Sequence, residues 1–398
     1  MTEVIEKTEN KKGYKKTKLG WIPEDWEVTK SGKLFYNYSK KNNKQEELLS
    51  VTQDRGVVPR SMVETRIAMP EGSTSSYKLV EKGDFVISLR SFQGGIEYSE
   101  YRGIVSPAYT ILKNNRDISD GYYKQWFKSS EFIARLGVAI IGIRDGKQIS
   151  YEDFSMLPIC YPPLKEQEKI AEILSAWDDG IKTLEKLIEQ KEILKNSLAQ
   201  KYFHRKNNLF QLKQHKLGEL FKNRKETNCC DLELLSVCDG LGIVPRSQLN
   251  AKDNSNEDKS KYLKVCVGDL AYNTMRMWQG RCGVSSYEGI VSPAYTVCVP
   301  KDNIDVDYMY YLFKTPHMIH DFWRYSQGIV DDTLNLKFNN FEAIKVWIPD
   351  KETQTKIAKL LKSYDEEIQI LNSKLEKLKE QKKGLMQKLL TGQIRVKI

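Results

Sequence analysis

The chain has 398 residues, of which 40% are hydrophobic, so it is long enough to form two or three domains that each bury a core. These values exclude an intrinsically disordered protein. The formal net charge of +10 suggests an anionic partner, although a lysine excess of this size also occurs in ordinary soluble proteins. No apolar run resembles a signal peptide or approaches the 18 residues of a membrane span, which predicts a cytoplasmic protein.

The first part of the chain predicts a flexible basic arm over residues 1–18 and a globular domain over residues 19–162. Alternating apolar and polar residues at 85–89, and the β-branched pair at 104–105, indicate strands. A helical pattern follows at 122–136. The domain is therefore predicted to mix α-helices and β-strands.

Residues 163–203 predict one long helix, since no proline follows Pro163 in this segment. Apolar residues recur there at alternating steps of four and three, which is a heptad pattern. Its members are Ile170, Leu174, Trp177, Ile181, Leu184, Ile188, Leu198 and Tyr202, and this set is called the seam. Only Lys191 and Lys195 interrupt it. A helix of about 40 residues spans roughly 60 Å, more than one domain covers, so the seam needs a long partner.

After a linker over residues 204–216, residues 217–349 repeat the first domain. The eight residues GIVSPAYT at 103–110 recur without change at 289–296, a shift of 186. Leu48–Val51 and Val58–Ser61 recur at the same shift, as do Arg90, Gln93 and Gly94 in Arg276, Gln279 and Gly280. This period is far longer than the roughly 20 to 50 residues of a solenoid repeat, so each copy is a domain.

A second long helix is predicted over residues 350–392, followed by a tail over 393–398. Its seam is interrupted only by Lys382 and consists of Ile357, Leu361, Tyr364, Ile368, Leu371, Leu375, Leu378, Leu385 and Leu389. The nearest long partner for each helix is the other one. The linker leads into the second domain from the far end of the first helix, which favours antiparallel pairing. The predicted fold class is α+β, with two duplicated domains of mixed α and β structure that are each followed by a helix of an antiparallel coiled coil.

Candidate DNA contacts lie on loops of the two domains. The two helices together hold 17 lysines and 15 acidic residues, and residues 1–18 carry +3, which leaves +5 for the domains and linkers. Such an excess gives moderate, salt-dependent phosphate affinity, whereas base readout needs arginine, glutamine or asparagine. Arg90 with Gln93, and Arg276 with Gln279, meet that need beside glycines. The alternative is that both arginines anchor their loops to carboxylates.

The segment GIRDGKQ at residues 142–148 lacks one spacing residue and the hydroxyl of a phosphate-binding loop, so nucleotide binding is not expected. A contact of Arg144 or Lys147 with the DNA backbone and a plain surface turn both remain open. The other candidate contacts are Arg55, Arg60, Arg246 and Arg281.

Differences between the copies are expected to carry sequence preference, while identical segments are expected to form the shared core. The differing pairs are Ser91-Phe92 against Met277-Trp278, Gly95-Ile96 against Arg281-Cys282, and Asp54-Arg55 against Gly240-Leu241.

The residues predict no catalytic, metal or cofactor site in this chain. Its seven cysteines form no C-x-x-C pair, and a zinc site would need an odd assortment of them with His317 and His320. Residues 161–164, YPPL, have the two prolines of an adenine methyltransferase loop but neither flanking residue. None of the four histidines lies near a convincing nucleophile partner.

Three segments in this order resemble the specificity subunits of type I restriction-modification systems, and the resemblance covers nearly the whole chain. Residues 19–26, LGWIPEDW, resemble the segment that opens the first target-recognition domain of that family. Residues 162–171, PPLKEQEKIA, resemble the start of its central helix, and residues 385–392, LMQKLLTG, resemble its C-terminal ending. The second domain lacks a counterpart of residues 21–23 and is predicted to start from Lys216-Leu217-Gly218.

The resemblance implies a non-catalytic subunit that recognises a bipartite double-stranded DNA target, one half-site per domain, with the gap fixed by the helices. It also implies two methyltransferase subunits and ATP-dependent restriction subunits as partners. The assembled complex would be a site-specific deoxyribonuclease and adenine-N6 methyltransferase that uses S-adenosylmethionine, ATP and Mg²⁺. The alternatives are a recognition subunit of another restriction-methylation enzyme, and a coiled-coil scaffold, which would leave the two duplicated domains unexplained.

Overall fold

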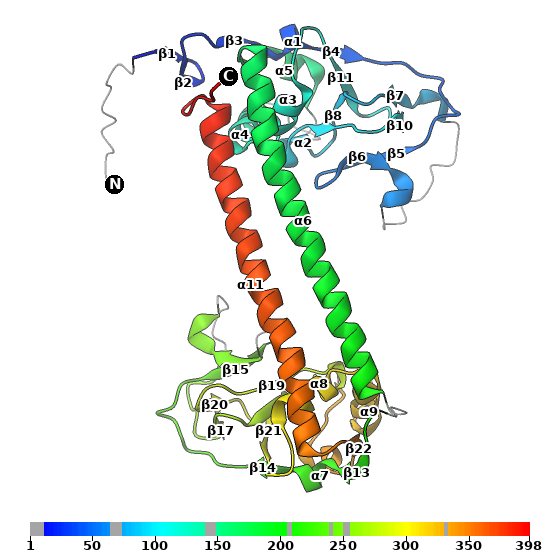
Figure 1. Cartoon of the computed structure of the whole chain (residues 1–398), viewed down its shortest axis with the longest axis vertical. Coiled ribbons are helices and arrows are strands. Elements are labelled where there is room, and N and C mark those ends of the chain that lie inside the picture. Colours follow the sequence, from blue (N-terminus) through cyan, green and yellow to red (C-terminus); the bar gives the residue numbers. More distant parts are fainter. Residues whose placement is uncertain are drawn as a thin grey trace. The chain divides into compact units, whose positions relative to one another are not determined.

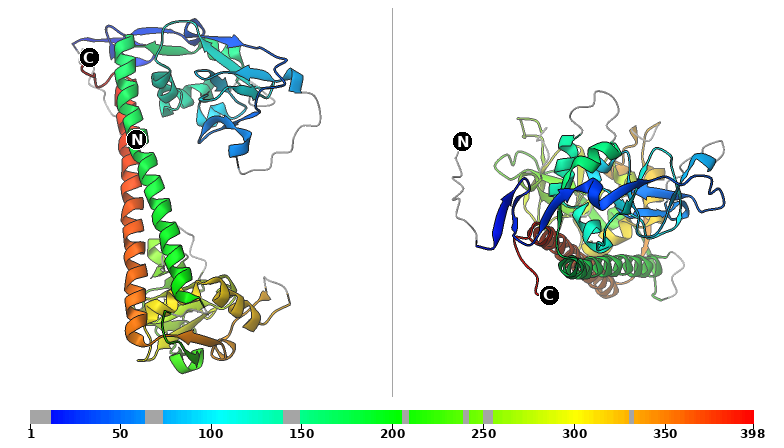
Figure 2. Two further views of the ribbon diagram at one scale, coloured as in Figure 1. Left: turned by 45° about the vertical axis from the view of Figure 1, so that its right-hand side comes forward. Right: turned by 90° about the horizontal axis from the view of Figure 1, so that it is seen from above.

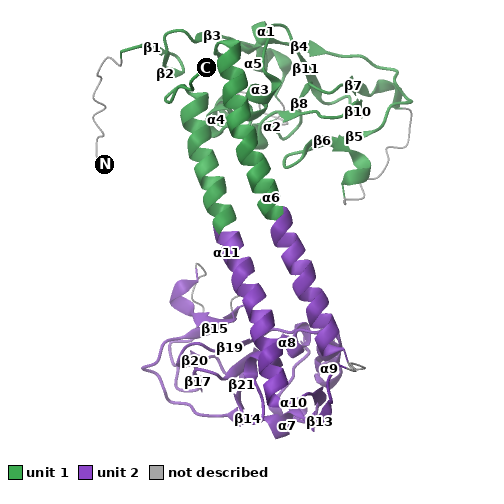
Figure 3. Ribbon diagram, in the orientation of Figure 1, with its two compact units in different colours: residues 1–185, 374–398 green, residues 186–373 purple. Residues whose placement is uncertain are grey.

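The computed structural model describes residues 12–63, 74–139, 149–204, 209–238, 242–249, 255–329 and 333–398. The chain divides into two compact units, one of residues 1–185 with 374–398 and one of residues 186–373 (Figure 3). Both long helices pass from one unit into the other, and each unit is described by itself. Among the described residues, no helix has the length and apolarity that a membrane crossing requires.

The first unit is built around a four-stranded antiparallel sheet with the order β4-β11-β8-β9 (Figure 1). These strands are Phe35–Tyr38, Thr110–Asn114, Phe85–Ile87 and Glu97–Tyr98. Alternate side chains point to opposite faces of a strand. Phe85 and Ile87 therefore join one buried cluster with the helices, whereas Val86 joins a second, smaller cluster on the other face.

Short helices and strand pairs complete this domain. The helices are α1 (Ser31–Leu34), α2 (Ser91–Gly94), α3 (Asp120–Trp126), α4 (Ser130–Ala139) and α5 (Tyr151–Met156), with the 3-10 turns η1 (Arg60–Met62) and η2 (Thr74–Ser76). The strand pairs are β3 (Glu27–Lys30) with β12 (Pro158–Tyr161), β5 (Leu49–Thr52) with β6 (Gly56–Pro59), and β7 (Lys78–Val80) with β10 (Gly103–Val105). The mixed α and β composition predicted from the sequence is confirmed.

The second unit repeats the sheet and the three strand pairs of this plan. Its sheet has the order β14-β21-β18-β19, which are Phe221–Arg224, Tyr295–Pro300, Leu270–Asn273 and Cys282–Val284. Its strand pairs are β13 (Lys213–Lys216) with β22 (Lys345–Ile348), β15 (Leu235–Cys238) with β16 (Gly242–Pro245), and β17 (Leu263–Val265) with β20 (Gly289–Val291). Its helices are α7 (Leu217–Leu220), α8 (Val306–Phe313), α9 (Pro316–Tyr325) and α10 (Phe338–Phe341), with the 3-10 turns η3 (Arg246–Gln248) and η4 (Met277–Gln279).

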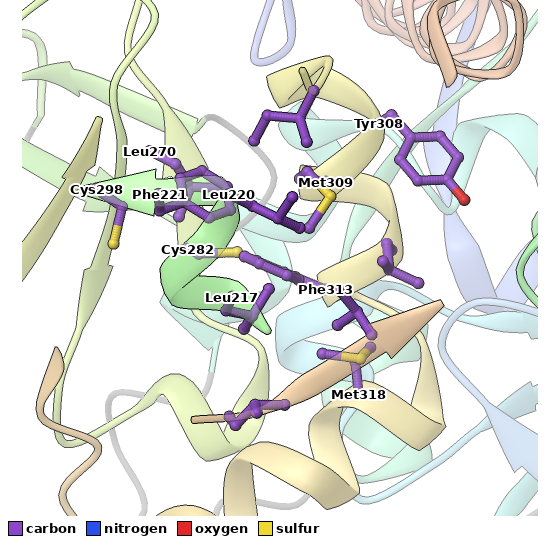
Figure 4. Close-up of a cluster of buried hydrophobic side chains, with 14 of the residues drawn as sticks. Leu217, Leu220, Phe221, Leu270, Cys282, Cys298, Tyr308, Met309, Phe313 and Met318 are labelled. Atoms are coloured by element: carbon purple, nitrogen blue, oxygen red, sulfur yellow. The ribbon is translucent and has the colours of Figure 1, made fainter. Parts of the chain in front are cut away.

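The core of the second domain lies between the sheet and the helices. Leu270 of β18, Met309 and Phe313 of α8, and Met318 of α9 form one buried cluster with Phe221 of β14 (Figure 4). The close counterpart in the first domain is the aromatic group around Phe35, whose ring lies 5.2 Å from that of Tyr123 and 5.6 Å from that of Phe85. The two domains therefore share a fold but fill its interior with different side chains.

The long helices α6 (Leu164–Phe203) and α11 (Lys351–Leu390) pair in antiparallel orientation within each unit (Figures 1 and 2). In the first unit, Asp178 and Glu185 of α6 form ion pairs of 2.6 and 3.0 Å with Lys382 and Lys379 of α11. In the second unit, Lys191 and Lys195 pair with Glu367 and Asp365. Residue numbers rise along one helix as they fall along the other, which confirms the antiparallel prediction.

Part of the predicted seam serves the domains as well as the helix pair. Ile170 and Leu174 of α6 belong to the core cluster of the first domain, and Ile357 and Leu361 of α11 belong to that of the second. The heptad pattern identified the buried face of each helix. It could not show that the N-terminal turns of that face pack on the globular domain that precedes the helix.

Each long helix begins with a buried glutamine that ties it to its domain. Gln167 donates from Nε2 to the carbonyl oxygen of Pro162 over 2.7 Å, and its Oε1 accepts a hydrogen bond from the backbone N–H of Ser119 over 3.0 Å. Gln354 makes the same two bonds, to Pro349 and from Asp305. Because Ser119 and Asp305 are the N-cap residues of α3 and α8, the amide joins two helix starts. This explains the glutamine in the PPLKEQ segment.

The first unit also contains a hairpin, β1 (Tyr14–Thr17) with β2 (Gly20–Pro23), for which the described part of the second domain has no equivalent. It lies beside the C-terminal tail, where the Tyr14 hydroxyl donates to the Gly392 carbonyl (Figure 2). Arg395 of the tail binds Asp25 and the fully buried Glu166. The predicted arm over residues 1–18 therefore ends inside a folded hairpin.

The start of the second domain also differs from its predicted position. Residues 213–216, assigned from the sequence to the linker, form β13 and pair with β22. A four-residue edge strand of polar residues, KQHK, carries no apolar alternation that would reveal it.

Candidate DNA-recognition surface

The loop that carries Arg90 and Gln93 follows the central strand β8 of the first domain. Ser91, the first residue of α2, is buried, and its Oγ accepts a hydrogen bond of 2.8 Å from the backbone N–H of Ser88. Gln53 of the β5–β6 turn donates from its Nε2 to the carbonyl oxygen of Arg90 over 3.3 Å. Arg90 and Gln93 are both exposed, so the backbone of this turn is fixed while the two predicted DNA contacts face solvent.

A lysine beneath the loop holds it from the inside. Lys128 donates from Nζ to the carbonyl oxygens of Gly94 (2.9 Å) and Gln53 (3.2 Å) and to Oε1 of Glu97 (2.5 Å). Glu97 is 1% exposed, and burial raises the pKa of its carboxyl to about 7 against the opposing effect of Lys128. The loop therefore rests on an ion pair between a buried carboxyl and a partly buried lysine.

Close packing fixes the end of this loop. Gly95 has a φ of +81°, and a Cβ at this position would lie 2.0 Å from the carbonyl oxygen of Phe127. Glycine is required here both by the backbone conformation and by the space. In the second copy the turn ends one residue earlier, and the positive φ falls on Gly280, so the counterpart Arg281 does not have to meet this requirement.

The equivalent loop of the second domain is supported differently. Met277 is completely buried in η4, which packs on α9, and the indole N–H of Trp278 donates to the Met275 carbonyl oxygen over 3.0 Å. Gly280 ends the turn in the left-handed conformation. Around this frame, Gln279 and Arg281 are exposed and Arg276 is partly buried.

The other predicted arginines fall into three situations. Arg55 lies on the β5–β6 turn beside the Arg90 loop, and its guanidinium donates to the Met62 carbonyl oxygen over 3.1 Å and pairs with Asp54. Arg60 and Arg246 begin η1 and η3 at the other end of β6 and β16, and both are partly buried. Arg144 and Lys147 lie outside the described residues. The structure thus brings Arg55, Arg90 and Gln93 onto neighbouring loops, and Arg60 begins the η1 turn whose last residue, Met62, accepts the hydrogen bond from Arg55.

The differing positions between the copies prove to be of two kinds. Ser91, Met277, Ile96 and Cys282 are buried, so these differences adapt the interior. Phe92 and Trp278 are only partly buried. That the differing positions carry sequence preference stays a prediction, but these four side chains do not face solvent. Period and spacing do not reveal which side of a short turn faces the core.

Sequence reasoning also missed an open depression of about 450 Å³ in the second domain. Thr274 and Met275, just before η4, form one wall, and Ala294 and Tyr295 of the repeated GIVSPAYT segment form another. The remaining lining is rich in amide and basic side chains, namely Asn223, Arg224, Lys225, Asn335, Lys337 and Asn339. Asn335 Oδ1 is buried and has no hydrogen-bond donor among the described residues. Such a lining offers donors and acceptors next to the predicted Arg276–Gln279 loop.

The repeated segment itself is divided between core and surface. Ile290 and Val291 are buried, and a Cβ on Gly289 would lie 2.5 Å from the Glu233 carbonyl oxygen, which accounts for the identity of this half. Pro293 and Ala294 are exposed and line the depression. The identity of the GIVSPAYT segment in both copies was a signal for this surface. The sequence interpretation assigned the whole segment to the core, although its second half is exposed.

The sequence matches the family described as "Type I restriction modification DNA specificity domain" over residues 3–194 and 247–380. The chain belongs to this family. Over 94% of both chains it is 24% identical to the type I restriction enzyme MjaVIII specificity subunit of Methanocaldococcus jannaschii. This specificity subunit therefore recognises DNA targets, as the sequence resemblance implied.

Solved structures of low sequence identity support the same fold. The type I restriction-modification S subunit from M. genitalium aligns with a TM-score of 0.55 at 15% identity, over 92% of this chain and 96% of that one. A chain from a structure on complex assembly and conformational transition of the type I system aligns with a TM-score of 0.58 at 13% identity, over 94% and 99%. The predicted architecture of two recognition domains, each followed by a long helix, is confirmed.

Proposed function

We propose that each recognition domain reads one half of a bipartite double-stranded DNA target, and that the helix pair sets the gap between the two half-sites. The observation that carries this proposal is that one fold occurs twice while the loops after β8 and β18 differ in residues, length and support. Two domains of the same fold with different loops are suited to recognise two half-sites of different DNA sequence. Base edges in the major groove are distinguished by side chains such as arginine, glutamine and asparagine.

In the first domain, the proposed reading loop carries Arg90 and Gln93, with Arg55 on the adjacent turn. Both Arg90 and Gln93 are exposed, and among the described residues the Arg90 side chain has no ion-pair partner. An arginine that only anchored its loop to a carboxylate would show such a partner within the domain. This geometry supports a DNA contact for Arg90 over the anchoring alternative.

In the second domain, the proposed surface combines Gln279 and Arg281 with the depression beside Arg276. The amide groups of Asn335 and Asn339 add acceptors and donors, and Lys225 and Lys337 are exposed cations for phosphate. The domains and linkers have only a modest basic excess, so affinity should depend on partners as well.

The proposed partners are two methyltransferase subunits and the ATP-dependent restriction subunits of the same system, in the cytoplasm. In this proposal S-adenosylmethionine, ATP and Mg²⁺ bind those partners, and the specificity subunit has no catalytic residue of its own. The assembled complex would methylate adenine at N6 and cleave DNA. Membership of the specificity family and the pairs of divergent loops support this division of labour.

The test is to express the chain with its methyltransferase and to map methylated adenines across a genome. A split motif is expected, and exchange of residues 19–162 with those of a relative should change one half of it only. Arg90→Ala should alter one half-site and Arg276→Ala the other. Methylation without a split motif would overturn the proposal, and equal weakening on all sequences would assign that arginine to phosphate binding or to structure.

A further inference from the structure

The lysines that interrupt the seams of the two helices all have acidic partners on the opposite helix. Lys382 of α11 pairs with Asp178 of α6 over 2.6 Å, and Lys195 of α6 pairs with Asp365 of α11. A polar residue at a seam position reduces stability but specifies how two helices align. These two ion pairs differ from the other interhelical pairs because a residue of a recognition domain joins each of them.

In the first unit, the third member is Gln125 of α3. Its Nε2 donates to Asp178 Oδ2 over 2.7 Å, and its Oε1 accepts from Lys382 Nζ over 3.2 Å. Lys382 Nζ closes the ring by donating to Asp178 Oδ1. Gln125 is 7% exposed, and the Lys382 side chain is 15% exposed. Domain, first helix and second helix therefore meet in one closed set of hydrogen bonds.

In the second unit, the third member is Tyr311 of α8. Its hydroxyl donates to Asp365 Oδ2 over 2.6 Å. The Lys195 ammonium, which bonds the other oxygen of Asp365, also lies 5.7 Å from the centre of the Tyr311 ring. Again one side chain of the domain, one acid and one lysine connect three helices.

The two sets are copies of each other. Asp178 and Asp365 differ by 187 positions, as do Lys195 and Lys382, and Gln125 and Tyr311 differ by the 186 of the domain repeat. The helices exchange roles, since α6 gives the acid in the first set and the lysine in the second. The acid and the lysine have been kept in both copies, whereas the domain residue has changed from an amide to a phenol.

Apolar contacts between helix and domain, such as those of Ile170 and Leu174, are strong but non-directional. Hydrogen bonds to charged groups require particular distances and angles. We propose that the two sets, Gln125–Asp178–Lys382 and Tyr311–Asp365–Lys195, are positioning residues that fix the rotation of each recognition domain about its helix pair. Together they would determine where each half-site lies, which rests on the proposed function of the helix pair as a spacer.

The test uses the full chain with its methyltransferase and measures the gap length of methylated targets. Tyr311→Phe keeps the ring and the Lys195–Asp365 pair but removes the bond to the domain. Gln125→Ala does the same in the first set. Each variant should keep both half-site sequences. The ratio of methylation at targets whose gap is one base pair longer or shorter to methylation at the original gap should rise at least fivefold over that of the original chain. Lys191→Met is the matched control, because its 2.9 Å pair with Glu367 includes no residue of a recognition domain in the described structure.

A charge exchange provides the rescue. In the double variant Asp178→Lys with Lys382→Asp, the amide of Gln125 can turn over, so that its oxygen accepts from the new lysine and its NH₂ donates to the new aspartate. This double variant should therefore methylate targets with a single gap length. The same exchange of Lys195 with Asp365 should restore less, since the Tyr311 ring would lose its cation. If Tyr311→Phe and Gln125→Ala keep the single gap, or lose methylation equally at all gaps, the positioning role is wrong although the split motif stands. If the unchanged chain yields no split motif, the proposed function itself fails.

Discussion

The buried pair of Glu97 and Lys128 makes the first recognition domain sensitive to pH, and Glu97→Gln tests this. Burial raises the pKa of Glu97 to about 7, whereas its ordinary value is 4.5. A carboxyl whose pKa is higher in the folded chain stabilises the fold at low pH, and this contribution is lost as the pH rises through the folded pKa. The free energy of unfolding of the original chain should therefore fall between pH 5 and pH 8. The Glu97→Gln variant should not show this part of the fall.

The size of this effect follows from the two pKa values. A difference between about 7 and 4.5 corresponds to roughly 3 kcal/mol at most, of which about 2–3 kcal/mol falls between pH 5 and pH 8. Glu97 is 1% exposed, so solvent screening reduces this figure little. Relative to the original chain, the variant should gain that amount as the pH rises, whatever its absolute stability at pH 5.

The assay is urea-induced unfolding of the full chain at both pH values. Unfolding is monitored by hydrogen exchange in a peptide that covers β8 and β9. This signal reports the first domain alone. Glu100→Gln is the matched control, since hydrogen bonding to Lys124 lowers the pKa of Glu100 and places its titration below this pH range. Glu100→Gln should differ from the original chain by the same amount at both pH values. A pH-independent difference for Glu97→Gln would refute the reasoning.

Three further changes test the packing. Gly95→Ala should displace the reading loop, because its Cβ would lie 2.0 Å from the Phe127 carbonyl oxygen at a φ of +81°, and binding to the first half-site should fall at least tenfold in a gel-shift titration. Gly180→Ala should raise the thermal midpoint, since an added Cβ meets no atom within 4 Å and alanine is favoured in a helix by about 1 kcal/mol. An unchanged or lower midpoint would contradict it. Arg395→Ala should cost about 2 kcal/mol in urea unfolding, since buried Glu166 loses two bonds from a guanidinium that is 38% exposed, while Arg395→Lys should recover part. No change in Arg395→Ala would mean that the ion pairs of Arg395 with Glu166 and Asp25 do not stabilise the first unit.

The architecture could be predicted because it depends on repetition and period, which a single sequence displays directly. The 186-residue shift gave two equivalent domains, and the heptad pattern gave two long helices with a buried face. Lys191, Lys195 and Lys382 looked like defects of that pattern. Their acidic partners lie more than 160 positions away in the chain, so only the folded structure shows that these lysines are paired.

The candidate surface was less predictable, because the backbone dihedral angles of one or two residues decide which side chains of a short turn face solvent. The sequence indicated that Arg90 and Gln93 lie on one loop, and both are exposed there, but it could not show that Ser91 between them faces inward. The depression around Asn335 was missed for a different reason. Its lining comes from segments between residues 223 and 339, and no local motif marks residues that meet only after folding.

The two proposed reading loops occupy equivalent positions, but different residues support them from beneath. This difference limits how the loops can be exchanged between the domains. Position 97 is a buried glutamate, and its counterpart Gly283 leaves no space for a side chain, since a Cβ there would lie 2.9 Å from the backbone of Gly242. Lys128 holds the first loop, whereas its counterpart Lys314 lies over the ring of Tyr310. A loop moved alone into the other domain would therefore lose its support or place a carboxylate against backbone. If these loops read DNA as proposed, sequence preference would depend on each loop together with the residues beneath it, and whole domains would be the units to exchange.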